Sequence, residues 1–198
     1  MKTMICTTLF LSAILLVSAS LNGQNIKVEK AWATADILTT SESVLYELGE
    51  KMLYVSCING NPTDKDGNGF ISQVTLSGEI VLLKWATGLN APKGMAVSKG
   101  MLYVTDIDRV VRIDLESGKI LKEFPVEGAR FLNDITTDNE GNIYISDMAT
   151  YKIHRIHNDA LGTWLEDENI VSPNGMNFSD GEVLIGTKKG IYGVRIED

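Results

Sequence analysis

The stretch "MLYVSCI" at residues 52–58 returns as "MLYVTDI" at 101–107, "NIYISDM" at 142–148 and "EVLIGTK" at 182–188. A short apolar stretch and a tight turn precede each copy, and a further alternating stretch follows each one. Alternation with period two, β-branched and aromatic residues, and Gly, Asp or Asn turns predict β-strands. Because the unit recurs along the chain, the sequence predicts a repeat architecture.

The repeated unit predicts a sheet of four short antiparallel strands in about 40 residues. That arrangement is typical of the blade of a β-propeller, and no helical periodicity competes with it. We therefore expect an all-β chain with a propeller domain at residues 24–198. Its blades should lie at about residues 42–88, 93–128, 133–169 and 174–198, the last with three strands. Residues 26–36 resemble a fourth strand, with Trp32 matching Trp85, and are a candidate for the outer strand that closes the last blade.

Composition and the N-terminus limit the class of function. The chain has 198 residues and a net charge of -8, which argues against a nucleic-acid partner because such a partner needs clustered Lys and Arg. Lys2 precedes an apolar run at residues 9–17, so residues 1–23 read as a signal peptide cleaved between about Ala19 and Gly23. A membrane anchor is the alternative, disfavoured because the run is shorter than the ~20 residues that span a bilayer. We expect a secreted or periplasmic monomer that is not bound to a membrane.

The loop "NPTDKDGNGFIS" at residues 61–72 resembles the first half of an EF-hand calcium-binding loop in sequence. Asp64, Asp66, Asn68 and Gly69 take the right positions, but the twelfth residue is Thr75 instead of the bidentate Glu. The residues that follow alternate as a strand, so no helix flanks the loop. The sequence therefore predicts no EF-hand, and leaves open a solvated hairpin loop or a weak ion site.

Alignment of the four units brings four polar residues to the entrance of the first, innermost strand. They are Glu42, Lys93, Asn133 and Asn174. Residues that enter the innermost strands surround one mouth of a propeller channel. A carboxylate and two amide oxygens there suit calcium or a similar divalent cation. The other interpretation is that the Asn residues only tolerate turn geometry before their strands.

Other conspicuous side chains are expected to be structural. Tyr54, Tyr103 and Tyr144 repeat at one strand position, which indicates packing between blades. Asp106 and Asp147 end equivalent second strands and are expected to cap turns.

The isolated Cys and His residues give weaker signals. Cys57 lies inside an apolar strand and is expected to be a small buried side chain. His154 and His157 are three residues apart on one strand, so they should point to opposite faces and cannot share a metal.

Three stretches resemble one known family. "SESVLY" (41–46), "ARFLNDITTDNEGNIYISD" (129–147) and "SPNGMNFSDGEVL" (172–184) are similar to motifs of the senescence-marker-protein/gluconolactonase/luciferin-regenerating-enzyme, or regucalcin-like, family of six-bladed propellers. The resemblance implies a divalent metal in the channel, most often Ca²⁺ with Zn²⁺ or Mg²⁺ as alternatives, and hydrolysis of sugar lactones. It also implies Glu42 and Asn174 as metal ligands, Asn133 beside the metal, and Arg130 as a substrate-holding residue. Lys93 has no family role and is a catalytic candidate from the repeat alignment alone.

Two functions follow from the sequence. The first is a secreted metal-dependent lactonase-like hydrolase, in which the cation polarises a lactone carbonyl. The alternative is a noncatalytic binding propeller or an inactive fragment, because the family's further Asp ligand has no equivalent here. Because members of the family have six blades and this chain has repeats for about four, we expect a C-terminally incomplete member, with a closed four-bladed ring as the alternative.

Overall fold

The computed structural model describes residues 29–196 of the chain. Residues 1–28, which include the whole of the expected signal peptide, and residues 197–198 lie outside that part. One compact unit of the chain begins at Trp32. Within the described residues, no helix is long and apolar enough to cross a membrane.

Fifteen strands form the described part of the folded unit, in sequence order. They are β1 (Ser41–Glu47), β2 (Met52–Cys57), β3 (Gly69–Thr75), β4 (Ile80–Leu89), β5 (Pro92–Ser98), β6 (Met101–Asp106), β7 (Arg109–Asp114), β8 (Ile120–Pro125), β9 (Leu132–Thr137), β10 (Ile143–Asp147), β11 (Lys152–His157), β12 (Ala160–Glu166), β13 (Met176–Ser179), β14 (Glu182–Thr187) and β15 (Gly190–Arg195). The expected all-β class is confirmed.

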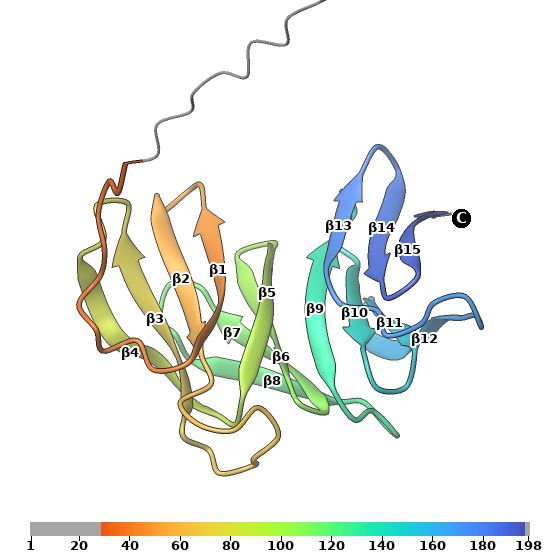
Figure 1. Cartoon of the computed structure of the whole chain (residues 1–198), viewed down its shortest axis with the longest axis horizontal. Coiled ribbons are helices and arrows are strands. Elements are labelled where there is room, and N and C mark those ends of the chain that lie inside the picture. The colour runs from red at the N-terminus through yellow and green to blue at the C-terminus, as the bar shows by residue number, and fades with distance from the viewer. Residues whose placement is uncertain (1–28, 197–198) are drawn as a thin grey trace, which may run out of the picture. The chain divides into compact units, whose positions relative to one another are not determined.

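The strands form three four-stranded sheets and one three-stranded sheet, all antiparallel. Strand order in each sheet follows the chain: β1 to β4, β5 to β8, β9 to β12, and β13 to β15. The first strands β1, β5, β9 and β13 pack in this order along the inner side of the arrangement in Figure 1. The sheets thus correspond to the four repeat units of the sequence.

Apolar side chains fill the space between successive sheets. Between the second and third sheets, Val110, Ile135 and Ile145 are almost fully buried in one cluster. Burial of side chains of this size contributes roughly 1.5–3 kcal/mol each. Since the second and third sheets each contribute to the clusters on both sides of them, the repeats support one another.

The repeated tyrosines lie in these layers, as expected. Tyr54 and Tyr144 are fully buried, and each meets a tryptophan of its own sheet edge-on. The ring centroids of Tyr54 and Trp85, and of Tyr144 and Trp164, are 4.8 Å apart in both sheets. This geometry is favourable for aromatic pairs and is the same in both repeats.

Cys57 and the two histidines also follow the expectations. Cys57 is completely buried. His154 is buried on β11 and His157 at the end of the strand is exposed, so the two rings do not share a face.

Two equivalent aspartates cap the joints between sheets. Asp106, at the end of β6, accepts hydrogen bonds from the backbone N–H of Asn90 and Ala91, at 3.0 and 2.7 Å. Asp147, at the end of β10, accepts from the N–H of Arg130 and Phe131, each at 3.1 Å. Both carboxylates therefore bind the connecting segment as it enters their own sheet from the preceding one, in keeping with the capping role that the sequence predicted.

The segment before β1 differs from the expectation for residues 26–36. Residues 29–36 form no strand, and residues 26–28 lie outside the described part. Trp32 packs on the β3–β4 turn, where a Cβ built on Gly78 would meet its ring at 2.5 Å. The likeness of Trp32 to Trp85 therefore reflects packing on the first sheet, and β15 has no fourth strand beside it among the described residues.

Candidate functional site

The four aligned positions of the sequence lie at four equivalent β-bulges. On β1, Glu42 is the extra residue between Ser41 and Ser43. On β5, Lys93 and Gly94 oppose one residue of β6, and on β9, Asn133 and Asp134 oppose one residue of β10. Bulges re-aim side chains and are enriched next to active sites.

The entrance of β13 repeats this two-against-one arrangement. Asn174 donates its N–H to the carbonyl of Gly186, and Gly186 donates to the carbonyl of Gly175, at 2.9 and 2.8 Å. Neither Asn133 nor Asn174 is among the residues with positive φ. These residues therefore occupy bulges, and the left-handed turn conformation is not the reason for their presence.

Hydroxyl groups opposite the bulges connect neighbouring sheets. Thr105 donates to the carbonyl of Asn133 in the next sheet at 2.6 Å, and Ser146 donates to the carbonyl of Asn174 at 2.9 Å. Ser146 also accepts the N–H of Asp134 in its own sheet at 2.9 Å. The bulges are thus held at one level by side chains as well as by packing.

The predicted site residues differ in exposure. Glu42 and Asn174 have exposed side chains, whereas Asn133 is only 8% exposed. Arg130 is exposed in the β8–β9 connection, and its backbone N–H, rather than its guanidinium, binds Asp147. The structure therefore places Arg130 on the rim beside the bulge of β9.

Lys93 is 1% exposed and its ammonium is held by backbone groups. Nζ donates to the carbonyls of Ala91 and Pro62, at 2.9 and 3.1 Å, and lies 4.6 Å from the centre of the Phe131 ring. Burial lowers the pKa of Lys93, and the charges of Asp106 and Glu42 raise it in part. The alignment predicted the position of Lys93, but not that its ammonium group anchors the loop at residues 61–72.

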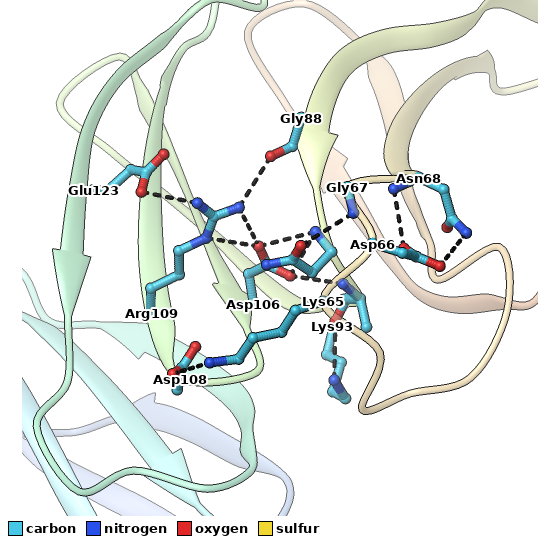
Figure 2. A network of polar contacts seen from close by, with 12 residues as sticks. Lys65, Asp66, Gly67, Asn68, Gly88, Lys93, Asp106, Asp108, Arg109 and Glu123 are labelled. Atoms are coloured by element: carbon cyan, nitrogen blue, oxygen red, sulfur yellow. Dashed lines mark hydrogen bonds and ion pairs between the residues drawn. The ribbon is translucent and has the colours of Figure 1, made fainter.

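That loop is the EF-hand-like stretch, and Figure 2 shows how it is held. Lys65 forms an ion pair with Asp108 at 2.5 Å, and the Asp66 carboxylate accepts from the N–H and side chain of Asn68, at 3.1 and 2.5 Å. Gly67 donates its N–H to the side chain of Asn90 at 3.1 Å. Asp66 thus stabilises a local turn, whereas Lys65 and Gly67 dock the loop on neighbouring segments.

Asp134 is a candidate site residue that sequence reasoning missed. Its Oδ2 accepts the N–H of Met176 on β13 at 2.6 Å, so the carboxylate bridges β9 and β13. Burial raises the pKa of Asp134, and the N–H groups of Met176 and Ile135 lower it in part. The equivalent bulge positions hold Ser43, Gly94 and Gly175, so the repeat gave no signal. The only clue was the break in the pattern at the "ND" pair.

Asp134 lines a cavity of about 510 Å³ on the concave side of the innermost strands. All four strands β1, β5, β9 and β13 contribute to its wall. The accessible surface of this lining is mainly polar, although Leu45, Met95 and Met176 also contribute to it. A concave site with converging polar groups is where small molecules usually bind.

Electrostatic coupling joins the cavity to its mouth. Desolvation raises the pKa of Glu42, Lys93 lowers it, and the negative charge of Asp134 raises it again. Glu42, Lys93 and Asp134 come from three adjacent inner strands, so the structure brings these three together. Perturbed carboxyl groups beside a cavity are a physical reason to consider a functional site.

A metal at this mouth is only partly compatible with the side chains. Glu42 and Asp134 repel each other, and the amide oxygens of Asn133 and Asn174 are hard donors of the type that calcium accepts. Within residues 29–196, however, no three His, Cys, Asp or Glu side chains are grouped closely enough to hold a metal ion. The donor type fits a divalent cation, and amide or water oxygens would have to complete its coordination.

Comparison with known proteins gives the fold class. No protein-family model and no curated protein sequence matches the chain. Virginiamycin B lyase from Staphylococcus aureus is similar in structure, with 17% sequence identity and a TM-score of 0.58. The matched region covers 77% of this chain and 50% of the lyase chain. A chain of the nidogen/laminin complex has 16% identity and a TM-score of 0.58, over 78% of this chain and 58% of that one. A streptogramin B lyase structure has 14% identity and a TM-score of 0.50, over 86% of this chain and 76% of that one.

The repeated antiparallel sheets and these neighbours define the chain as a β-propeller protein. The chain spans about half the length of the S. aureus virginiamycin B lyase chain. Identities this low concern the fold alone, and the resemblance to the regucalcin-like family stays a prediction.

Proposed function

We propose that this β-propeller is a small-molecule hydrolase of the lactone and ester class, secreted or periplasmic, with its site at the bulged end of the concave cavity. The observation that carries the proposal is the pair of coupled carboxyl groups, Glu42 and Asp134, at the mouth of a cavity with a mainly polar accessible lining. The existence of enzymes among the propeller neighbours, the streptogramin B lyases, makes this class of function compatible with the fold.

The two carboxyl groups suit two different tasks in ester hydrolysis. Glu42 is exposed and, with Asn174, would hold a divalent cation, most readily Ca²⁺ with Zn²⁺ or Mg²⁺ as alternatives. Such a cation, when bound, supplies polarisation of the carbonyl and stabilisation of the oxyanion. Asp134 is more buried, and its raised pKa makes it a stronger proton acceptor than an exposed aspartate.

The remaining residues would position the substrate. Asn133 is buried beside Asp134 and carries amide groups that can bind the substrate carbonyl or a water molecule. Arg130 on the rim can hold an anionic or polar substituent. Lys93 contributes its positive charge near Glu42, with its ammonium engaged by Ala91 and Pro62.

Hydrolysis of a panel of neutral lactones by the purified chain, with CaCl₂ or with EDTA, tests the proposal. Asp134→Asn should lower kcat by about 100-fold or more, as loss of a general base does, without abolishing calcium binding. Glu42→Gln should abolish both calcium binding and the calcium dependence of hydrolysis. Glu79→Gln removes the same charge on the exposed β3–β4 turn and should change neither. Hydrolysis that is unaffected by the first two variants, or absent with every lactone and metal, would overturn the proposal.

A noncatalytic binding propeller is the second candidate. It is favoured by the missing third acidic or histidine ligand within residues 29–196. Calcium titration separates the two, because a binding propeller would take up small molecules in the cavity without calcium and without hydrolysing them.

A further inference from the structure

The fourth sheet exposes an apolar position that is buried in each of the other three sheets. On the third strand of those sheets, Ile71, Val110 and Ile153 are completely buried against the sheet that follows. Ile191 on β15 is their equivalent in the repeat and is 80% exposed, because no described sheet follows the fourth. We call this side of the fourth sheet the trailing face. It has the apolar residue of an interface between sheets, without the second sheet.

The first sheet has the corresponding exposed positions at the other end of the row. Met95 and Ile135, on the first strands of the second and third sheets, face the preceding sheet and are 6% and 4% exposed. Val44 is their equivalent on β1 and is 62% exposed, and Tyr46 on the same side of β1 is 46% exposed. We call this side of the first sheet the leading face. The row of sheets therefore ends in two different faces, each of the kind that packs on the other kind inside the row.

The chain before β1 takes the place of an outer strand in front of the leading face. Inside the row, Trp85 on the outer strand β4 lies against Gly118 in a turn of the second sheet, where an added Cβ would be 3.1 Å from its ring. Trp32 lies in the same way against Gly78, in the equivalent turn of the first sheet, with its ring 2.5 Å from an added Cβ. Trp32 thus stands where a preceding sheet would present the tryptophan of its outer strand. Among the residues that the structure describes, the fourth sheet is the one without an outer strand.

The two end faces do not meet within one chain. The first strand β1 packs on β5, and β13 packs on β9. The exposure of Val44 and Ile191 agrees, because contact between the first and fourth sheets would bury both side chains. A partner for either face therefore has to come from another molecule.

The repeat indicates which surface fits each end face. Val110 and Ile135, on successive sheets, belong to one buried cluster. Ile191 is the equivalent of Val110, and Val44 is the equivalent of Ile135. The counterpart of the trailing face is therefore a leading face, which a second copy of the same chain provides.

We propose that two copies of the chain associate head to tail, with the trailing face of each packed on the leading face of the other, and close a ring of eight sheets, four from each copy. Residues 32–36 of each copy add the outer strand to β15 of the other, whose free edge pairs with no described strand. Propellers typically have about four to eight blades, so such a ring lies within the known range. A head-to-tail contact gives a closed assembly when its rotation completes the ring. The proposal departs from the monomer expected from the sequence.

The ring also completes the candidate site. Glu42 on β1 and Asn174 at the entrance of β13 belong to the two end sheets of one chain. In the ring, β1 of one copy follows β13 of the other, so Asn174 and Glu42 of different copies become neighbours at the channel mouth. This consequence rests on the proposed function, whereas the association of the end faces does not.

Light scattering of the purified chain tests the association, and we expect the mass of two chains. Val44→Asp and Ile191→Asp should each lower the mass about twofold, to that of one chain, because each variant buries an unpaired charge in the interface. Both side chains are exposed in the single chain, so the variants should fold. Leu121→Asp changes a 51% exposed leucine of β8, which belongs to neither end face, and should leave the mass unchanged.

A mixture of variants tests the head-to-tail arrangement. Val44→Asp keeps its trailing face and Ile191→Asp keeps its leading face, so the two together should regain the mass of two chains. A contact between like faces would respond to only one of the two variants.

Cross-linking gives a second measurement if either Asp variant fails to fold. A short bismaleimide should join Val44→Cys to Ile191→Cys in a mixture and should join neither variant to itself. Cys57 is buried and should not react.

Three results overturn the ring: a wild-type mass of one chain, a mass that grows beyond two chains with concentration, or a response of only one Asp variant. Absence of the mixed cross-link contradicts it as well. Failure of the ring is separable from failure of the proposed function. A two-chain ring that hydrolyses no lactone refutes the hydrolase alone, and hydrolysis by a single chain refutes the ring alone.

Discussion

The hydroxyl of Thr105 on β6 donates a hydrogen bond of 2.6 Å to the backbone carbonyl of Asn133 on β9, in the next sheet. Both residues are buried, Thr105 completely. The bond joins two sheets at the level of the bulges that carry the candidate site. Ser146 and Asn174 repeat the relationship one sheet further on.

Thr105→Val should therefore destabilise the protein without changing the volume of the side chain. The variant leaves a buried carbonyl at Asn133 without its donor, which typically costs about 1–3 kcal/mol. Urea denaturation measures the loss in free energy of unfolding. Thr87→Val, on the exposed face of β4, is the matched control and should lie within about 0.5 kcal/mol of wild type. If both variants are equally stable, the hydroxyl bridge contributes nothing.

Gly94→Ala should separate β5 from β9. A Cβ at Gly94 would lie 2.7 Å from the Cα of Asp134 and 2.8 Å from the carbonyl oxygen of Asn133, so the backbone has to move. We expect a loss of about 1–3 kcal/mol in unfolding free energy, as for overpacked cores. The same backbone displacement should weaken the binding of a lactone in the cavity that Asp134 lines, which calorimetry can measure.

Gly162→Ala on β12 is the control for this prediction, because a Cβ there meets nothing within 4 Å. Gly162 has no unusual φ, so alanine should be neutral or slightly stabilising. A Gly94→Ala variant as stable as Gly162→Ala would show that the strands tolerate a wider separation at the bulges.

Asp106→Asn should be strongly destabilising, because Asp106 is fully buried and pairs with Arg109 at 2.8 Å (Figure 2). Removal of one partner from a buried ion pair costs about 3 kcal/mol. Asp108→Asn breaks the exposed pair with Lys65 and should cost less than about 1 kcal/mol. Thermal or urea unfolding of the two variants checks the difference, and equal losses would contradict it.

The repeat predicted the fold and the level of the site because both depend on backbone position. Glu42, Lys93, Asn133 and Asn174 were aligned from sequence and occupy equivalent bulges. A repeat does not determine where a side chain points, since the bulge inserts one residue and alters the alternation locally. The ammonium of Lys93 therefore contacts Pro62 and Ala91, which no alignment of repeats could indicate.

Asp134 was missed because its acidic character is not repeated in the other units. Reasoning from repeats selects positions that are polar in every unit, whereas Asp134 is acidic where the other units have Ser43, Gly94 or Gly175. The small residues there permit close approach of neighbouring strands, as at Gly94. A charged residue at such a position stands out only when the packing of the neighbouring strand is known.

The stability of the protein should fall in mild acid because of His154. Burial lowers the pKa of His154 below 6.5, the charge of Asp147 raises it in part, and Lys152 lowers it further. His154 is therefore neutral in the folded state, while the unfolded chain takes up a proton near pH 6.5. The contribution to stability is complete above that pH and is lost as the pH falls toward the lower pKa of the folded state.

The loss due to this one proton can reach about 1.4 kcal/mol per pH unit. Urea unfolding of wild type and His154→Leu between pH 7.5 and 5 measures it as the difference between the two curves, because most carboxylate contributions cancel. Identical slopes for wild type and His154→Leu would mean that His154 does not titrate on unfolding. The acid sensitivity would then have to come from carboxyl groups whose pKa is lower in the folded state, such as Asp138, where burial raises the pKa but hydrogen bonds from Asn142 and Tyr144 lower it overall.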